Sequence, residues 1–241
     1  MNKFLLLVLA LPFAAFASSQ EATLQPAPID NRDVVSIQRG AQVFVNYCLN
    51  CHSAQYMRYN RLMDLGLTEP QVRDNLMFAG SKVGETMSIA MRKADAKEWF
   101  GVPPPDLSVI ARSRGADWLY GYLRSYYRDE KSPTGWNNLV FPNVGMPNVL
   151  WKLQGQQILK VQEEGEGHSR HKLETLVLEK PGELSPHEFD KRVADLVNFL
   201  VYLGEPARAE RVQVGYAVLI ALGVLFALAY LLKKEYWKDV H

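Results

Sequence analysis

The feature that most constrains this chain is the run Cys-Leu-Asn-Cys-His at residues 48–52. Two thiols spaced by two residues lie on one side of a helical turn, so each can join one vinyl group of a porphyrin, and the adjacent imidazole can bind the iron. Both cysteines of the chain belong to this run, so neither is left for a disulfide or a zinc site. A thioredoxin-like dithiol is the alternative, but its β-α-β pattern is missing. We therefore expect one haem c on Cys48 and Cys51, with His52 as an axial ligand.

The amino-terminal residues indicate export. Residues 1–17 combine a lysine, an apolar run and an Ala-Phe-Ala cleavage site, which is typical of a secretory signal peptide. Residues 18–32 contain two prolines and no packing pattern, and we expect an extended leader there.

The carboxyl end predicts a membrane anchor. Residues 212–232 carry no charge and would form a helix about 30 Å long, which matches the hydrocarbon core of a bilayer. Lysines in the tail 233–241 favour the cytoplasm for that end. We expect a single-pass protein of the cell inner membrane, with a haem domain over 33–205 on the periplasmic side and a linker over 206–211.

Apolar periodicity predicts two long helices that cross beside the haem motif. One begins at Asp33 and leads to Cys48. Gly40 within it costs roughly 1 kcal/mol relative to alanine, which favours a close approach of another helix. That partner begins at a capping box, Ser185 to Glu188, and its apolar stripe ends at Leu203.

The middle of the chain predicts shorter elements. We expect, in order, a helix over 68–77, a helix over 107–111 capped by Asp106, a helix over 118–127 capped by Asp117, irregular backbone over 132–148, and a β-hairpin of strands 149–161 and 172–178. The fold class is thus mainly α, with a small β-hairpin insertion and one carboxyl-terminal transmembrane helix. A formal net charge of +1 gives no sign of a nucleic-acid partner.

A sixth ligand for the iron is expected among the methionines. Met146 lies in an irregular segment between Gly145 and Pro147, where a loop can wrap around a haem and hold a side chain. Met87 and Met91 are the next candidates. A thioether sulfur stabilises ferrous iron and raises the reduction potential, so ligation by His52 and Met146 predicts an electron carrier.

Charged side chains near the haem motif remain open to two interpretations. Arg112 or Arg114 can pair with a haem propionate or be an ordinary surface charge. Glu163, Glu164 and Glu166 can steer a basic partner or form a solvated turn, and the turn is the simpler interpretation.

Several motifs occur together in one order along the chain: residues 48–53, Pro-Pro-Asp-Leu-Ser at 104–108, residues 112–114, Gly-Met-Pro at 145–147, and Glu-Pro at 205–206 ahead of the terminal apolar segment. In this combination the chain resembles cytochrome c1 of bacterial type, the haem subunit of the quinol:cytochrome c oxidoreductase (bc1) complex.

The resemblance implies a class I cytochrome c fold with the hairpin inserted after the methionine ligand. By motif matching, His52 and Met146 are the axial ligands, Arg114 is the propionate partner, and a carbonyl of the Pro104-Pro105 loop, assigned to Pro105, accepts a hydrogen bond from the His52 ring. Two departures concern the haem edge: residues 99–102 replace an Asn- and Gly-rich segment, and Trp118 stands where a tyrosine is expected.

The function implied is electron transfer without catalysis by the chain alone. A single electron would come from the Rieske iron-sulfur protein and pass to a soluble cytochrome c or similar acceptor, with cytochrome b and the lipid bilayer as further partners. Two alternatives stay open: an anchored cytochrome shuttle or oxidase haem subunit, and a haem peroxidase or sensor with an open sixth position.

Overall fold

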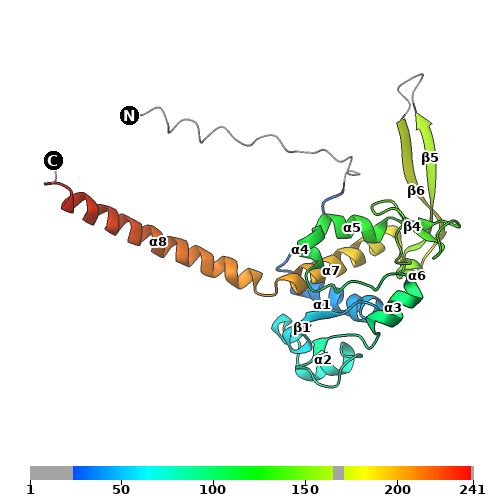
Figure 1. Ribbon diagram of the computed structural model, residues 1–241, viewed down its shortest axis with the longest axis horizontal. Helices are drawn as coiled ribbons and strands as arrows, with labels where there is room; N and C mark the ends of the chain where they lie inside the picture. Colours follow the sequence, from blue (N-terminus) through cyan, green and yellow to red (C-terminus); the bar gives the residue numbers. More distant parts are fainter. Residues whose placement is uncertain (1–23, 165–170, 240–241) are drawn as a thin grey trace.

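The computed structural model describes residues 24–164 and 171–239. Its centre is a pair of crossing helices, α1 (Val34–Val43) and α7 (Pro186–Gly204) (Figure 1). Asp33 caps α1 by accepting a hydrogen bond from the Ser36 N–H at 2.9 Å. The same helix continues as a π-helical turn, η1 (Phe44–Cys48), and ends in the cysteine motif. The predicted early and late helices are thus confirmed.

The crossing point of α1 and α7 lies at Gly40. A Cβ atom placed on Gly40 would lie 2.0 Å from the carbonyl oxygen of Asp195 and 2.7 Å from Cβ of Phe199. The Asp195 carboxylate also accepts a hydrogen bond from the Ser36 hydroxyl at 2.7 Å, and it forms an ion pair with Arg39 at 2.6 Å. The expected close approach is confirmed, and a buried polar contact fixes its register.

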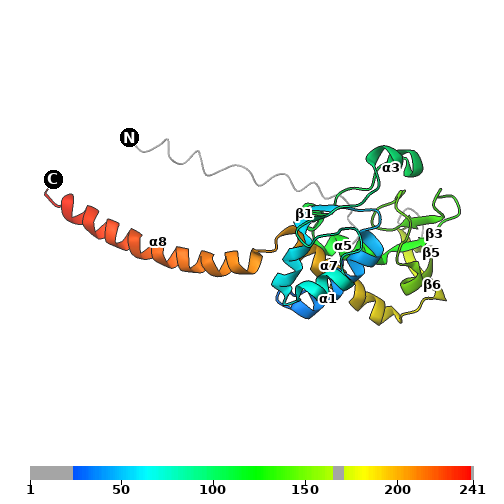
Figure 2. The same cartoon turned by 90° about the horizontal axis from the view of Figure 1, so that it is seen from below.

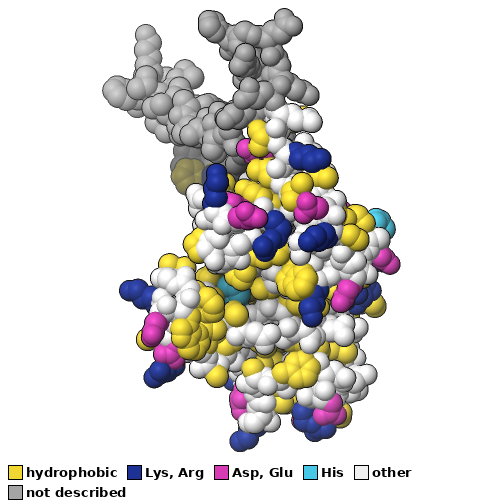
Figure 3. Space-filling model, turned by 90° about the vertical axis from the view of Figure 1, so that its right-hand side faces the viewer, with side chains coloured by type: hydrophobic (Ala, Val, Ile, Leu, Met, Phe, Trp, Pro, Cys, Tyr) yellow, Lys and Arg dark blue, Asp and Glu magenta, His cyan; other side chains and the backbone are white. Residues whose placement is uncertain are grey.

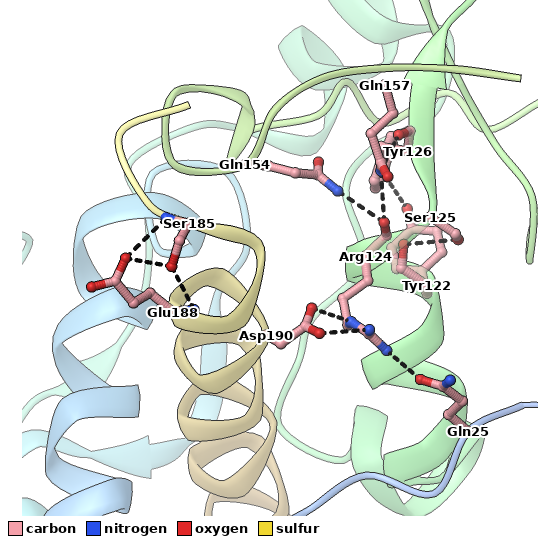
Figure 4. A network of polar contacts seen from close by, with 10 residues as sticks. All are labelled: Gln25, Tyr122, Arg124, Ser125, Tyr126, Gln154, Gln157, Ser185, Glu188 and Asp190. Carbon is pink, nitrogen blue, oxygen red and sulfur yellow. Dashed lines mark hydrogen bonds and ion pairs between the residues drawn. The ribbon is translucent and has the colours of Figure 1, made fainter. Parts of the chain in front are cut away.

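Helix α7 begins at the predicted capping box (Figure 4). The Glu188 N–H donates to the Ser185 hydroxyl oxygen, while the Glu188 carboxylate accepts from the Ser185 N–H at 2.9 Å. These bonds satisfy two backbone donors that a helix start leaves free.

Removing this cap is expected to weaken the whole domain, since α7 forms half of its central crossing. Ser185→Ala should lower the free energy of unfolding by about 1 kcal/mol at neutral pH, measured by chemical denaturation of the full chain in detergent. Hydrogen bonds from the Ser185 side chain and backbone lower the pKa of Glu188. The part of the stabilisation that comes from the Glu188 carboxylate is therefore present above the unfolded-state pKa and lost as the pH falls through the folded-state pKa, whereas the bond from the Glu188 N–H to the Ser185 hydroxyl does not depend on pH. An equal loss at neutral and strongly acidic pH would contradict this account.

Shorter elements surround the central pair in chain order. They are β1 (Ala54–Arg58), the 3-10 helix η2 (Tyr59–Leu65), α2 (Glu69–Asn75), β2 (Thr86–Met87), α3 (Lys93–Phe100), α4 (Ile110–Arg114) and α5 (Ala116–Arg124). Strands β1 and β2 pair antiparallel, and α5 lies beside α7. The helix expected over 68–77 is confirmed as α2, whereas α3 and the β1–β2 pair were not expected. Figure 2 shows α3 at the edge of the body.

Both aspartates expected to cap helices do something else. Asp106 accepts from the N–H groups of Ser108 and Gln55, at 2.8 and 3.0 Å, so it ties two loops together while the helix begins later, at Ile110. Asp117 lies inside the first turn of α5 and accepts from the Ala27 N–H at 2.7 Å. These two predictions were wrong because other backbone donors bind the carboxylates: Asp106 accepts from a neighbouring loop residue and a distant one, and Asp117 accepts from the distant Ala27.

The region after α5 contains more regular structure than expected. Strands β3 (Tyr126–Arg128) and β4 (Trp136–Asn138) pair antiparallel, so the backbone over 132–148 is not wholly irregular. Helix α5 correspondingly ends at Arg124, before the predicted limit. A short helix, α6 (Trp151–Gln154), precedes the expected hairpin.

The hairpin consists of β5 (Gly155–Glu164) and β6 (His171–Pro181), and it projects from the body (Figure 1). Its base is held by two glutamines, since the side chains of Gln154 and Gln157 donate to the carbonyl oxygen of Arg124 at 2.8 and 2.9 Å (Figure 4). The predicted hairpin is confirmed, with its first strand starting later than expected.

The described part of the leader, residues 24–32, is extended but packed. The Asn198 amide donates to the carbonyl oxygen of Asp30 at 2.8 Å, and Arg124 donates to Gln25 at 3.0 Å (Figure 4). Ala27 and Ile29 lie against the core. The leader therefore has a packing role that its composition did not indicate, whereas the predicted signal peptide, residues 1–17, lies outside the described residues.

Helix α8 (Arg208–Tyr236) projects from the body on the side away from the hairpin (Figure 1). Within the described ranges, Glu210–Tyr236 is long and apolar enough to cross a membrane, and none of its most apolar stretch is buried by protein. The helix includes Arg208 to Arg211, so the chain between α7 and α8 is shorter than the expected linker 206–211. An apolar rod of this length needs a lipid or protein cover.

Candidate haem site

The cysteine motif forms a tight turn at the end of η1. The N–H groups of Cys51 and His52 both donate to the carbonyl oxygen of Cys48, at 3.1 and 2.9 Å. Both cysteines are free thiols; Cys48 is buried and Cys51 is partly exposed. Burial, with a smaller effect of Cys51, raises the pKa of the free Cys48 thiol to about 12, so that sulfur is neutral before any thioether forms.

The ring of His52 is oriented by the backbone of the proline-rich loop. Its Nδ1 lies 2.7 Å from the carbonyl oxygen of Pro105. Because a carbonyl only accepts, Nδ1 carries the proton, and Nε2 is left with a lone pair. Burial lowers the pKa of His52, partly offset by Pro105 and Asp106, which favours the neutral ring that a metal needs.

The proline-rich loop is itself fixed to the chain that follows His52. The Leu107 N–H donates to the carbonyl oxygen of Ser53 at 2.8 Å, and the Tyr56 N–H donates to the Ser108 hydroxyl at 3.1 Å. Together with Asp106, these bonds hold the Pro105 carbonyl against the histidine.

An open cleft of about 400 Å³ joins the cysteine motif to the methionine loop. Cys51 and Pro147, which follows Met146 in the chain, both line it. The remaining lining is largely aromatic and amide: Asn46, Tyr47, Asn50, Trp136, Asn148, Val149 and Trp151. Two segments far apart in sequence thus meet at one cavity, which has the mostly apolar lining that a porphyrin requires.

Two buried or partly buried asparagines hold the loop that carries Met146. The Asn138 side-chain oxygen accepts from the N–H groups of Val140 and Phe141, at 2.9 and 3.0 Å. Asn137 accepts from the Asn143 N–H at 2.8 Å, where the chain has a φ of 61°. Asparagine tolerates this left-handed conformation better than most residues, so the turn needs no glycine.

The sulfur of Met146 accepts a hydrogen bond. The Tyr122 hydroxyl donates to it at 3.5 Å, and the side chain packs against a small cluster of Tyr126, Trp136 and Val144. The rival Met87 is fully buried in the main core and lies opposite Ala54 in the β1–β2 pair. Met91 is partly exposed after β2. Of the three, Met146 is the one adjacent to the cleft.

Arg114 lies at the end of α4 with its guanidinium over two aromatic rings, 5.0 Å from the centre of Trp118 and 6.0 Å from Phe141. Trp118 stacks in turn on Tyr122, with ring centres 4.8 Å apart. Within the described residues Arg114 has no carboxylate partner. An exposed cation on this aromatic stack is available to an anionic group, whereas Arg112 lies against Gly204 of α7.

The residues present fit a covalently attached haem. Two free thiols are the groups that attach a haem c to a protein chain. An imidazole with a bare Nε2 and a thioether beside the cleft are the two axial donors that a six-coordinate haem c would use. Sequence reasoning missed Tyr122, Tyr126 and Trp136. The spacing of Trp118 and Tyr122 was a visible signal for Tyr122, since residues i and i+4 share a helix face, whereas Tyr126 lies beyond the end of α5, in β3.

The role of the acidic run Glu163, Glu164 and Glu166, as a docking patch or a solvated turn, stays a prediction. Glu163 and Glu164 belong to β5, but their side chains and all of Glu166 lie outside what the structure describes. On the face seen from the hairpin side, apolar side chains lie in separate groups between lysines and arginines (Figure 3).

Comparison with known proteins relates nearly the whole chain to cytochromes c1 and to one protein of another name. A family model described as the Cytochrome C1 family matches residues 25–156 and 179–240, which leaves out most of the hairpin. Cytochrome c1 of Allochromatium vinosum is 51% identical over 97% of this chain and 96% of its own length. A Nitrosomonas europaea protein named ammonia monooxygenase gamma subunit is 53% identical over 100% of this chain and 99% of its own length.

More distant relatives extend the comparison to mitochondria. The mitochondrial cytochrome c1 haem protein of Neurospora crassa is 25% identical over 85% of this chain and 62% of its own length. The mainly α architecture with its small hairpins and single apolar carboxyl-terminal helix fits the class I cytochrome fold. The chain therefore belongs to the cytochrome c1 family, the membrane-anchored, haem c-bearing electron-transfer subunits of the bc1 complex.

Proposed function

We propose that Cys48 and Cys51 carry the haem through thioether bonds, that His52 and Met146 are its axial ligands, and that Arg114 pairs with a propionate. The observation that carries this proposal is the 2.7 Å contact between His52 Nδ1 and the Pro105 carbonyl oxygen. It fixes the tautomer and the ring orientation and leaves Nε2 as the ligand atom.

The chain's own residues perform three tasks in this proposal. The haem, when bound, carries one electron by changing between the ferric and ferrous states. Pro105 holds the His52 ring, the asparagine-anchored loop presents Met146, and the aromatic side chains that line the cleft would shield a bound haem from water. A thioether ligand favours ferrous iron and hence a high potential.

The proposed partners follow from the family and from the apolar helix. Cytochrome b would contact the α8 anchor within the bilayer, the Rieske iron-sulfur protein would supply the electron, and a soluble cytochrome c would accept it. The haem domain would lie on the periplasmic side of the inner membrane, with Lys233, Lys234 and Lys238 in the cytoplasm. On its own the chain would catalyse no reaction.

A second candidate role follows from the Nitrosomonas relative, whose printed name assigns it to ammonia monooxygenase. Purification of the full chain from detergent-solubilised native membranes separates the two roles. Recovery together with cytochrome b and Rieske subunits is the expected result. Recovery with monooxygenase subunits would favour the second role, and recovery of the chain alone would favour an independent cytochrome shuttle.

An optical spectrum of the same preparation tests the ligands. We expect the weak long-wavelength band of sulfur bound to ferric iron, and no spectral shift when carbon monoxide is added to the reduced protein. A missing sulfur band with a prompt carbon monoxide shift would indicate an open iron, as in a peroxidase or sensor, and would contradict the Met146 assignment.

A further inference from the structure

Two tyrosines form a directional hydrogen-bond chain that ends on Met146. The Tyr126 hydroxyl lies 2.5 Å from the Tyr122 hydroxyl, and the Tyr122 hydroxyl lies 3.5 Å from the Met146 sulfur. A thioether sulfur has no proton, so Tyr122 must be the donor in the second contact. Its only proton is then used, and Tyr126 must be the donor in the first.

Both tyrosines are shielded from water. Tyr126 is 1% exposed, and the partly buried Tyr122 ring lies against the rings of Trp118 and Tyr126. A donor that itself accepts a hydrogen bond becomes a stronger donor, and the effect is larger where water is excluded. The chain therefore delivers a polarised O–H group to the sulfur.

The ring of Tyr122 is held from several sides, so its hydroxyl has little freedom to turn elsewhere. Trp118 stacks on it with an angle of 10° between the ring planes, and Tyr126 meets its ring at 66°, with centres 5.3 Å apart. Its backbone carbonyl accepts from the buried Asn138 amide at 2.8 Å. Figure 4 shows Tyr122 and Tyr126 together beside the base of the hairpin.

We propose that Tyr122 is a positioning residue for Met146: its hydroxyl, polarised by Tyr126, holds the sulfur in place and raises the reduction potential of the site. This inference rests on the proposed function, because it takes Met146 as the axial ligand. A hydrogen bond withdraws electron density from the sulfur, which weakens its donation to ferric iron more than to ferrous iron. Ferrous iron is thereby favoured.

The test compares Tyr122→Phe with wild type by potentiometric titration of the full-length holoprotein in detergent. Phenylalanine keeps the ring and its stacking and removes only the hydroxyl. At the wild-type midpoint potential, we expect the ferrous-to-ferric ratio to fall about threefold to tenfold, the range of one lost neutral hydrogen bond. Tyr126→Phe should shift the ratio in the same direction by less, since it removes only the polarising donor.

Tyr120→Phe is the matched control. Tyr120 is buried in the same helix, but its ring lies under the guanidinium of Arg124 and belongs to the main core, not to the small cluster against which Met146 packs. An unchanged potential and an unchanged sulfur band in Tyr122→Phe would overturn the inference. So would a larger shift in Tyr126→Phe than in Tyr122→Phe. Loss of the sulfur band in Tyr122→Phe alone would support it, since the ring is retained.

The proposed function can fail separately. If Met146→Ala keeps the sulfur band, Met146 is not the ligand, and the function proposal fails whatever Tyr122→Phe does. If Met146→Ala loses the band while Tyr122→Phe behaves like wild type, only the role of the tyrosine pair is wrong.

Discussion

Replacing Met146 with alanine is expected to open the iron and to lower its reduction potential. The sulfur of a methionine ligand stabilises ferrous iron, and Met146 directly precedes Pro147, which lines the same cleft as Cys51. We expect a fall of more than about 60 mV, a tenfold change for one electron. The same variant should lose the sulfur band of the ferric protein and bind carbon monoxide rapidly when reduced.

The controls for this prediction are leucine replacements of the rival methionines. Met87 is fully buried in the core, so alanine there would leave a cavity and cost roughly 2–5 kcal/mol, which would confuse the test. Met87→Leu and Met91→Leu remove the sulfur at nearly constant volume. Both should keep the wild-type spectrum. If either one opens the iron while Met146→Ala does not, the loop assignment is wrong.

Replacing Gly40 with alanine is expected to destabilise the haem domain strongly. The new Cβ would lie 2.0 Å from the Asp195 carbonyl oxygen, which is backbone of α7 and cannot turn away. Helix propensity would recover roughly 1 kcal/mol, whereas overpacking costs typically 1–3 kcal/mol and more where backbone must shift. The steric effect should prevail, because separating α1 from α7 also breaks the contacts of Asp195 with Ser36 and Arg39.

We expect a net loss of about 2 kcal/mol or more in the free energy of unfolding, measured by chemical denaturation of the full chain. Gly121→Ala is the matched control, a helical glycine whose added Cβ would meet the flexible end of Leu24 at 2.9 Å. That variant should be neutral or slightly more stable. A Gly40→Ala protein as stable as wild type would mean that the two helices can separate without cost.

The sequence was sufficient to predict those features that depend only on residues close together in the chain. The cysteine motif, the Ser185 capping box, the apolar stripe of α7 and the terminal apolar helix each depend on spacing within one element. The structure and the family comparison agree with these predictions. Gly40 belongs here too, because a glycine inside an amphipathic helix already indicates a close contact.

Only the tertiary structure revealed the hydrogen bonds between residues that are far apart in the sequence. Asp106 and Asp117 have the composition of helix caps, yet distant backbone donors bind their carboxylates. The contact of His52 with Pro105 joins positions 53 residues apart. Such pairings depend on which chain segments meet, and local propensity carries no information about that.

The methionine site shows both contributions most clearly. Gly145 and Pro147 indicated a loop around Met146 before any fold was known, since they disfavour regular structure. The sequence by itself thus determined the haem motif, a candidate ligand and the anchor. Only the folded chain brings Tyr122 to the sulfur and Cys51 to the same cleft as Pro147, because these contacts form when α5, β4 and the methionine loop pack together.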